Sequence, residues 1–161
     1  MEVYAAMIDD LDQHIGRLIT WLDDQQQLEN TVIIFMSDNG AEGHTIDQTW
    51  PRAQFPKIRK NIVERHDFSF ANIGKVGSYA FNGPNWAQAS SPAFRLYKGF
   101  VTEGGTRVPA FITYPAFANG KTTDEFLSVK DIVPTLLEIT KIKHPAPIYN
   151  GTQIEAPSGF S

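Results

Sequence analysis

The sequence contains no cysteine, and it has no long apolar run. The first absence excludes disulfides, thiolate zinc sites and cysteine nucleophiles, and it leaves a periplasmic and a cytoplasmic location both open. The longest apolar run, Thr31 to Met36, is far shorter than the roughly 20 residues that span a bilayer, so we expect no membrane-spanning helix. Four acidic residues within Met1 to Asp12 argue against a secretory signal peptide.

Positive charge is almost missing from the first third of the chain. Residues 1–50 hold ten acidic residues and a single base, Arg17, whereas residues 51–161 hold thirteen bases and eight acids. These bases are scattered or lie in the short cluster Lys57 to Lys60, and none of them interleaves with aromatic residues as in RNA-binding motifs. We therefore expect no nucleic-acid partner.

The most regular segment is residues 4–22, where apolar side chains recur every three or four positions. They are Tyr4, Met7, Ile8, Leu11, Ile15, Leu18, Ile19 and Leu22. This spacing predicts an amphipathic helix that ends near Gln26, with an exit turn at residues 28–30. The β-branched and aromatic run 31–36 then predicts a strand buried on both faces, as in a parallel sheet covered by helices.

The rest of the chain carries weaker signals. Residues 41–92 are rich in Gly, Pro, Asn and Ser, which predicts a long irregular loop or insertion. A second strand is predicted at residues 108–114. Ser128 to Asp131 resembles a capping box, so a helix is expected from there to about Thr140, and no element is predicted in the tail after Lys141. Two helices and two strands make a thin core, which indicates part of a larger α/β protein.

Ser37-Asp38-Asn39-Gly40 lies directly after the first strand, at the edge where α/β proteins bind ligands. Asp38 and Asn39 place a carboxylate and an amide carbonyl side by side, and both are hard oxygen donors suited to Ca²⁺ or Mg²⁺. Two donors are too few for such a cation, so further ligands must come from elsewhere. The same residues also fit an Asx-type turn that only ends the strand.

A second candidate segment is Arg95 to Pro109, in which Lys98 lies between aromatic residues and precedes Gly104 and Gly105. A lysine is a compact cation that can hold an oxyanion, and paired glycines let backbone N–H groups approach a ligand. A surface hairpin with a solvated lysine fits the same residues.

The four histidines lack the paired spacing of a metal site. We expect His14 on the surface of the first helix, and His44 in a loop from which it could approach a substrate. His66 and His144 match no motif. We expect Glu103 to stabilise the glycine turn that directly follows it rather than to act as a catalytic acid or base.

Four stretches match the pattern of one enzyme family: Tyr4 to Arg17, Asn30 to Gly40, Trp86 to Pro109 and Asp131 to Leu137. In this order they resemble the C-terminal part of the catalytic domain of the sulfatase family, and specifically bacterial-type arylsulfatases. Residues 1–161 are therefore predicted to be part of one sulfatase catalytic domain that lacks the N-terminal, nucleophile-bearing part and the C-terminal subdomain.

The resemblance implies a piece of an alkaline-phosphatase-like α/β/α sandwich that hydrolyses small-molecule sulfate esters with one Ca²⁺. It implies that Asp38 and Asn39 are two of the metal ligands and that Lys98 is a catalytic residue contacting the sulfate. The nucleophile of the family is a formylglycine made from a Cys/Ser-x-Pro-x-Arg motif. The nearest string, Ser90 to Phe94, ends in phenylalanine where the motif requires arginine, so we predict that the chain alone is inactive.

Two other interpretations stay open. A hydrolase of the same superfamily that acts on phosphate or phosphonate esters would share the metal-binding turn. A truncated, non-catalytic remnant acting as a binding module would bind Ca²⁺ only weakly.

Overall fold

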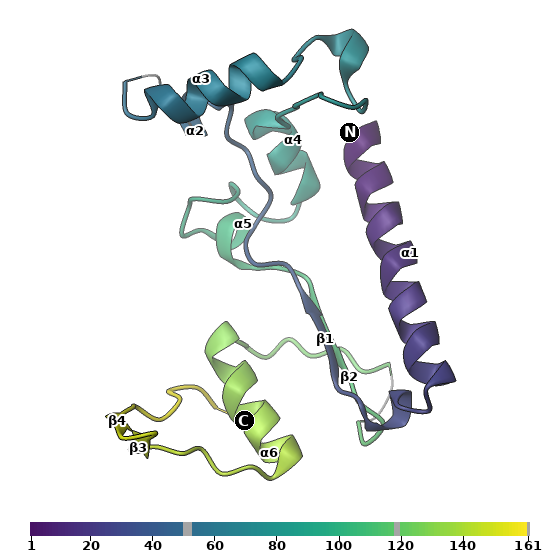
Figure 1. Cartoon of the computed structure of the whole chain (residues 1–161), viewed down its shortest axis with the longest axis vertical. Helices are drawn as coiled ribbons and strands as arrows, with labels where there is room; N and C mark the ends of the chain where they lie inside the picture. Colours follow the sequence, from purple (N-terminus) through teal and green to yellow (C-terminus); the bar gives the residue numbers. More distant parts are fainter. Residues whose placement is uncertain (50–52, 118–119, 161) are drawn as a thin grey trace. The chain divides into compact units, whose positions relative to one another are not determined.

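The computed structural model describes residues 1–49, 53–117 and 120–160 (Figure 1). The chain divides into two compact units, Met1–Asn119 and Gly120–Ser161. Each unit combines helices with a two-stranded antiparallel sheet. This mixture agrees with the α/β class that the sequence predicts.

The first unit opens with α1 (Glu2–Asp24), the helix that the apolar periodicity predicts. It ends slightly earlier than expected, because Gln26 has a left-handed backbone (φ 55°) that an α-helix cannot continue. The predicted exit turn is a 3-10 helix, η1 (Leu28–Asn30). Much of the apolar stripe stays exposed; Met7, for example, is 65% exposed.

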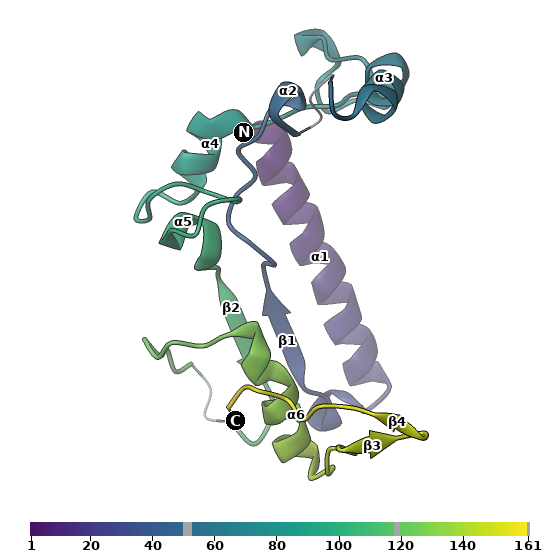
Figure 2. The same ribbon diagram turned by 90° about the vertical axis from the view of Figure 1, so that its left-hand side faces the viewer.

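β1 (Ile33–Met36) and β2 (Ala110–Thr113) form an antiparallel ribbon, and both lie within their predicted ranges. The two strands run side by side in both views (Figures 1 and 2). Across the ribbon, the rings of Phe35 and Phe111 stack with centroids 5.2 Å apart. The expectation of a parallel partner and of burial on both faces is wrong for this pair. β1 is only half-buried, because β2 is its one strand partner among the described residues.

The prediction of an irregular loop over residues 41–92 is also wrong. Helices form there: α2 (Ile46–Thr49), α3 (Pro56–Arg65), the 3-10 helix η2 (Phe70–Asn72) and α4 (Gly83–Ser90). Both α3 and α4 carry a proline in the first turn, where the missing N–H has no intrahelical partner to lose. These prolines therefore mark helix starts rather than a loop. The glycine turn before β2 is likewise a short helix, α5 (Glu103–Thr106).

The second unit contains the predicted capping box. The 3-10 helix η3 (Val129–Asp131) leads directly into α6 (Ile132–Thr140). The hydroxyl of Ser128 accepts the N–H of Lys130, and the carboxylate of Asp131 accepts the N–H of Ser128 at 2.7 Å. Both the helix start and its end at Thr140 are confirmed.

The tail of the second unit is a hairpin that the sequence analysis does not predict. Its strands are β3 (Ile148–Tyr149) and β4 (Thr152–Gln153). The two turn residues both have positive φ, 47° at Asn150 and 78° at Gly151. This is the backbone of a type I′ turn, which the dipeptide Asn-Gly favours, so that dipeptide is the sequence signal for the hairpin.

Little of the described chain is buried. Ala87 in α4 is the one apolar side chain fully removed from solvent among the described residues. Within the same described part, no helix is both long enough and apolar enough to cross a membrane. The candidate site therefore depends on backbone hydrogen bonds and on glycine packing rather than on a surrounding apolar core.

Candidate functional site

The loop after β1 and the loop before β2 lie together, because an antiparallel ribbon places the end of one strand beside the start of the other. The N–H of Gly40 donates to the carbonyl of Gly105 at 3.0 Å. The N–H of Lys98 donates to the carbonyl of Ala41, also at 3.0 Å. The structure thus joins the turn that carries the predicted metal ligands to the loop that carries the predicted sulfate contact.

Glycine is required where the two loops touch. A Cβ on Gly40 would lie 1.8 Å from the carbonyl oxygen of Gly104, and a Cβ on Gly104 would lie 1.9 Å from the carbonyl oxygen of Leu96. A Cβ on Gly43 would stand 2.5 Å from the ring of Tyr97. Backbone atoms cannot yield at such distances without moving the loops. The glycines therefore allow the close approach.

The segment that carries Lys98 folds back on itself. The N–H of Gly104 and the hydroxyl of Thr102 both donate to the carbonyl of Arg95, at 3.0 and 2.7 Å. Gly99, directly after the lysine, has a φ of 92° that glycine adopts readily. Lys98 is thus presented at the bend of a closed loop rather than on the open surface hairpin that the sequence also allowed.

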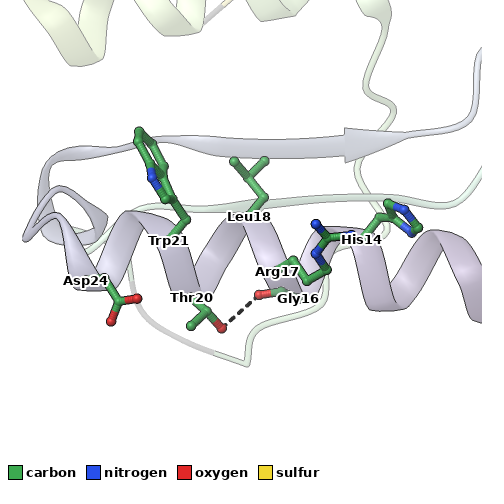
Figure 3. A pocket seen from close by; sticks show the side chains of 7 residues that line it. All are labelled: His14, Gly16, Arg17, Leu18, Thr20, Trp21 and Asp24. Carbon is green, nitrogen blue, oxygen red and sulfur yellow. Dashed lines mark hydrogen bonds between the residues drawn. The ribbon is translucent and has the colours of Figure 1, made fainter.

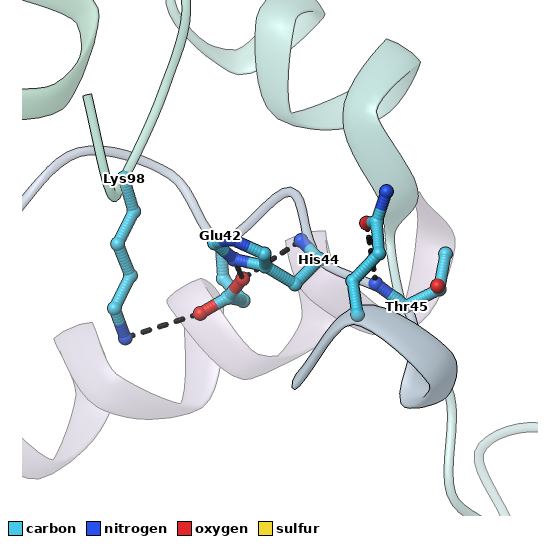
Figure 4. Close-up of polar contacts among 5 residues, drawn as sticks. Glu42, His44, Thr45 and Lys98 are labelled. Carbon is cyan, nitrogen blue, oxygen red and sulfur yellow. Dashed lines mark hydrogen bonds and ion pairs between the residues drawn. The ribbon is translucent and has the colours of Figure 1, made fainter. Parts of the chain in front are cut away.

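The side chains of Glu42, Lys98 and His44 meet at this junction (Figure 4). Nζ of Lys98 lies 3.1 Å from Oε2 of Glu42. Oε1 of Glu42 accepts the backbone N–H of His44 at 2.8 Å and also bonds Nδ1 of its ring. Partial burial alone would raise the pKa of Glu42, but the two bonds from His44 and the ammonium of Lys98 together hold it below its ordinary value.

The sequence analysis assigns no role to Glu42. Its carboxylate and Lys98 are separated along the chain by α2, α3 and α4, so no local spacing relates them. The one sequence feature that points to Glu42 is the Glu-x-His string at Glu42 and His44, which places a carboxylate and an imidazole in one glycine-rich loop.

Asp38 and Asn39 stand at the start of the same loop, directly beyond β1. The turn is closed by the hydroxyl of Ser37, which donates to the backbone carbonyl of Asn39 at 2.8 Å. The Asp38 side chain is exposed, and its carboxylate has no hydrogen-bond or ion-pair partner in the described part of the chain. The side chains of Asp38 and Asn39 are therefore not used to form the turn, which argues against the Asx-type interpretation.

These two side chains fit a calcium ion as part of a larger ligand set. Ca²⁺ prefers six to eight oxygen ligands, among them carboxylates and amide carbonyls. Within the described ranges, no group of three or more His, Asp or Glu side chains is placed to hold a metal ion. Asp38 and Asn39 can thus supply two donors, which is fewer than the six to eight that a Ca²⁺ ion takes.

Glu103 and Arg107 form an exposed ion pair across α5, with 3.8 Å between them. The guanidinium of Arg107 also lies over the ring of Phe94, 5.0 Å from its centroid. Glu103 therefore stabilises its own turn, in line with the expectation.

Three of the histidines make local contacts. His14 is exposed on α1, as predicted, and its Nδ1 bonds the carbonyl of Asp10 at 2.7 Å. Nδ1 of His66 bonds the carbonyl of Ile62 at 2.9 Å, and Nδ1 of His144 accepts the N–H of Ala146 at 3.1 Å. These bonds stay within each residue's own segment, and the His66 ring also meets that of Tyr79 edge-on, with centroids 5.1 Å apart.

A surface hollow on α1 is a weaker candidate (Figure 3). It is lined by residues of that one helix: His14, Gly16, Arg17, Leu18, Thr20, Trp21 and Asp24. The hydroxyl of Thr20 donates to the carbonyl of Gly16 at 3.0 Å, so this hydroxyl is satisfied within the helix. Because one helix supplies every lining residue, the hollow has no opposing wall to enclose a ligand.

The chain is similar to sulfatases along most of its length. The sequence pattern of the sulfatase family matches residues 1–142. An uncharacterized sulfatase of Schizosaccharomyces pombe is 44% identical over 99% of this chain, and an arylsulfatase of Klebsiella aerogenes is 33% identical over 88% of it. The chain spans 28% and 30% of the length of these two relatives. The family match includes the loops of both Asp38 and Lys98, and the chain therefore belongs to the sulfatase family, with its alkaline-phosphatase-like α/β fold.

Proposed function

We propose that the natural protein is an arylsulfatase-type hydrolase of small-molecule sulfate esters. In this proposal Lys98 contacts the sulfate group, and Asp38 and Asn39 are two ligands of one Ca²⁺ ion. Family membership and the arylsulfatases of Klebsiella aerogenes and Clostridium perfringens among the relatives support this assignment.

The observation that carries the proposal is the junction of the two loops. The bond from the N–H of Lys98 to the carbonyl of Ala41 fixes the lysine backbone to the loop that begins with Asp38 and Asn39. The loop of Lys98 and the loop of Asp38 and Asn39 therefore meet at one end of the β1–β2 ribbon, which supports the proposal that the lysine and the two oxygen donors belong to one site. A cation and a metal ion can together neutralise an ester that carries a negative charge.

Lys98 has the right chemistry for a sulfate contact. Its ammonium carries three N–H donors and no acceptor, and its charge neutralises a sulfate oxygen and the negative charge that develops as the ester bond breaks. When bound, Ca²⁺ would polarise the sulfate oxygens as a Lewis acid.

We further propose that residues 1–161 alone do not turn over substrate. The motif from which the family makes its formylglycine nucleophile is absent from this stretch, and Asp38 and Asn39 supply only part of a calcium shell. Turnover by this polypeptide in isolation would overturn this part of the proposal.

The test uses the natural protein at its full length, assayed with an aryl sulfate and the matching aryl phosphate. We expect sulfate to be preferred. Lys98→Ala should lower kcat/KM about a hundredfold while Ca²⁺ binding, measured by calorimetry, is retained. Asp38→Ala should lower both Ca²⁺ binding and turnover.

Matched controls are Lys60→Ala and Asp12→Ala, which remove an exposed charge of the same sign outside the junction. Both should leave turnover and Ca²⁺ binding unchanged. A preference for phosphate would favour the related ester hydrolases instead. Weak Ca²⁺ binding without hydrolysis of either ester would identify a non-catalytic binding module.

A further inference from the structure

The carboxylate of Glu42 is held at both oxygens (Figure 4). Oε1 takes the backbone N–H and the ring of His44. Oε2 faces the ammonium of Lys98 at 3.1 Å. Since each oxygen has its own partner, the carboxylate is oriented relative to its loop, and Lys98 meets it through a charge-assisted bond of defined direction.

His44 is itself fixed by the loop that carries the lysine. Its Cε1 lies so near Gly99 that an added Cβ there would be 3.2 Å away. Its ring also meets that of Tyr97 edge-on, with centroids 6.4 Å apart. Tyr97 and Gly99 flank Lys98 in the chain. The imidazole that orients Glu42 therefore packs against the same turn that presents the lysine.

A lysine at this position needs a partner that fixes the position of its ammonium group. Lys98 is 44% exposed, and its four-carbon stem has many rotamers, so an unpaired ammonium would sample many positions. One of its three N–H donors suffices for Glu42, which leaves two for the oxygens of a ligand. The carboxylate of Glu42 can thus fix the position of the Lys98 ammonium while two N–H donors of the lysine stay available.

We propose that Glu42 is a positioning residue for Lys98, and that His44 holds Glu42 in the orientation this requires. The proposal rests on the function proposed above, in which Lys98 contacts the sulfate group. Glu42 acts through the lysine and does not touch the ester, so its contribution must disappear when the lysine is removed.

A double-mutant cycle in the full-length protein tests this dependence. Glu42→Gln keeps the side-chain size and removes the charge, and we expect kcat/KM for an aryl sulfate to fall about tenfold through misplacement of the ammonium. In a Lys98→Met background, the same substitution should cause no further loss. Equal losses in both backgrounds, or no loss while Lys98 is present, would overturn the proposal.

Glu64→Gln is the matched control for Glu42→Gln. Glu64 also pairs with a lysine, Lys60 at 3.6 Å, but both residues belong to α3. Its loss of charge should leave kcat/KM unchanged in either background. A tenfold loss from Glu64→Gln as well would attribute the Glu42 effect to overall charge and overturn the positioning role.

A spectroscopic measurement separates this proposal from the proposed function. Carbon-13 NMR of the Glu42 carboxyl in the same protein follows its titration whether or not an ester is hydrolysed. Lys98→Met and His44→Ala should each raise the pKa of Glu42, because each removes a bond that lowers it. If the pKa responds and no sulfate ester is hydrolysed, the anchoring stands and the proposed function fails. An unchanged pKa in Lys98→Met would overturn the anchoring itself.

Discussion

The α-carbon of Gly40 lies directly against the backbone of Gly104, so closely that a Cβ on Gly40 would stand 1.8 Å from the Gly104 carbonyl oxygen. This contact, together with the bond from the Gly40 N–H to the Gly105 carbonyl at 3.0 Å, fastens the two loops of the candidate site. No side-chain rearrangement can make room there, because the opposing atom belongs to the main chain.

Gly40→Ala should therefore destabilise the protein by about 2 kcal/mol, the usual cost of overfilling a packed site. Chemical denaturation of the wild type and the variant measures the difference. Gly16→Ala is the matched control, since nothing lies within 4 Å of a Cβ at that position of α1. That variant should gain roughly 0.5–1 kcal/mol from a better helix former. Equal stability of Gly40→Ala and wild type would contradict the close approach of the loops.

Gly151→Ala should weaken the hairpin of the second unit. Gly151 has a φ of 78° with open space around it, so the cost is conformational and amounts to about 1 kcal/mol. NMR amide shifts of β3 and β4 report the loss of pairing directly. Unchanged shifts would mean that the turn tolerates a side chain in the left-handed region.

Acid should loosen the start of α6 through Asp131. The N–H of Phe160, and then that of Ser128, lower the pKa of the Asp131 carboxyl below its ordinary 3.8. A carboxyl whose pKa is lowered on folding contributes stability above its ordinary value and loses that contribution as the pH falls through the lowered value. The amide shifts of Ser128 and Phe160 should therefore change together below pH 3.8.

Asp131→Asn is expected to abolish this acid transition while leaving the rest of the spectrum intact. Glu138→Gln, which removes an exposed acid from α6, should leave the transition in place. An acid transition at Ser128 and Phe160 that persists in Asp131→Asn would assign the effect to another group.

Calcium removal should lower the melting temperature of the full-length protein. An ion that binds only the folded state adds about 2.7 kcal/mol at a hundredfold excess over its Kd. Thermal melts with Ca²⁺ and with a chelator measure this difference, and Asp38→Ala should reduce it whereas Asp12→Ala should not. Identical melts of the wild type under both conditions would contradict the assignment of Asp38 as a ligand.

Elements with a local signal are predictable from this sequence. The apolar spacing of α1 and the run at β1 each indicate their element within a few residues. The reciprocal bonds of Ser128 and Asp131 confirm the capping box that begins the last helix. In these cases the residues that define the element are also its neighbours in the chain.

The helices and strands that the sequence does not predict are those whose residue patterns fit more than one kind of structure. Proline is common both in loops and in the first turn of helices. Here Pro56 and Pro84 lie in the first turns of α3 and α4. The strands on either side of the Asn150-Gly151 turn are so short that no alternation of apolar and polar residues can be recognised in them. The parallel sheet expected around β1 fails for a different reason, because an apolar run does not specify the direction of its partner.

For the candidate site, residue identities are easier to predict than contacts. Asp38, Asn39 and Lys98 follow from motifs, and the structure brings their loops together, although their roles stay predictions. Glu42 is different, because its importance arises from a partner that lies three helices further along the chain. Only the fold places its carboxylate beside the lysine.

The two loops of the site are joined chiefly from main chain to main chain, as in the bond from Lys98 to Ala41. Such a joint does not depend on which side chains project from it. The exposed side chains of this segment, such as those of Arg95 and the 96% exposed Val101, take no part in these main-chain bonds. A change of side chain at such a position would therefore leave the Lys98 backbone at the same distance from the β1 loop.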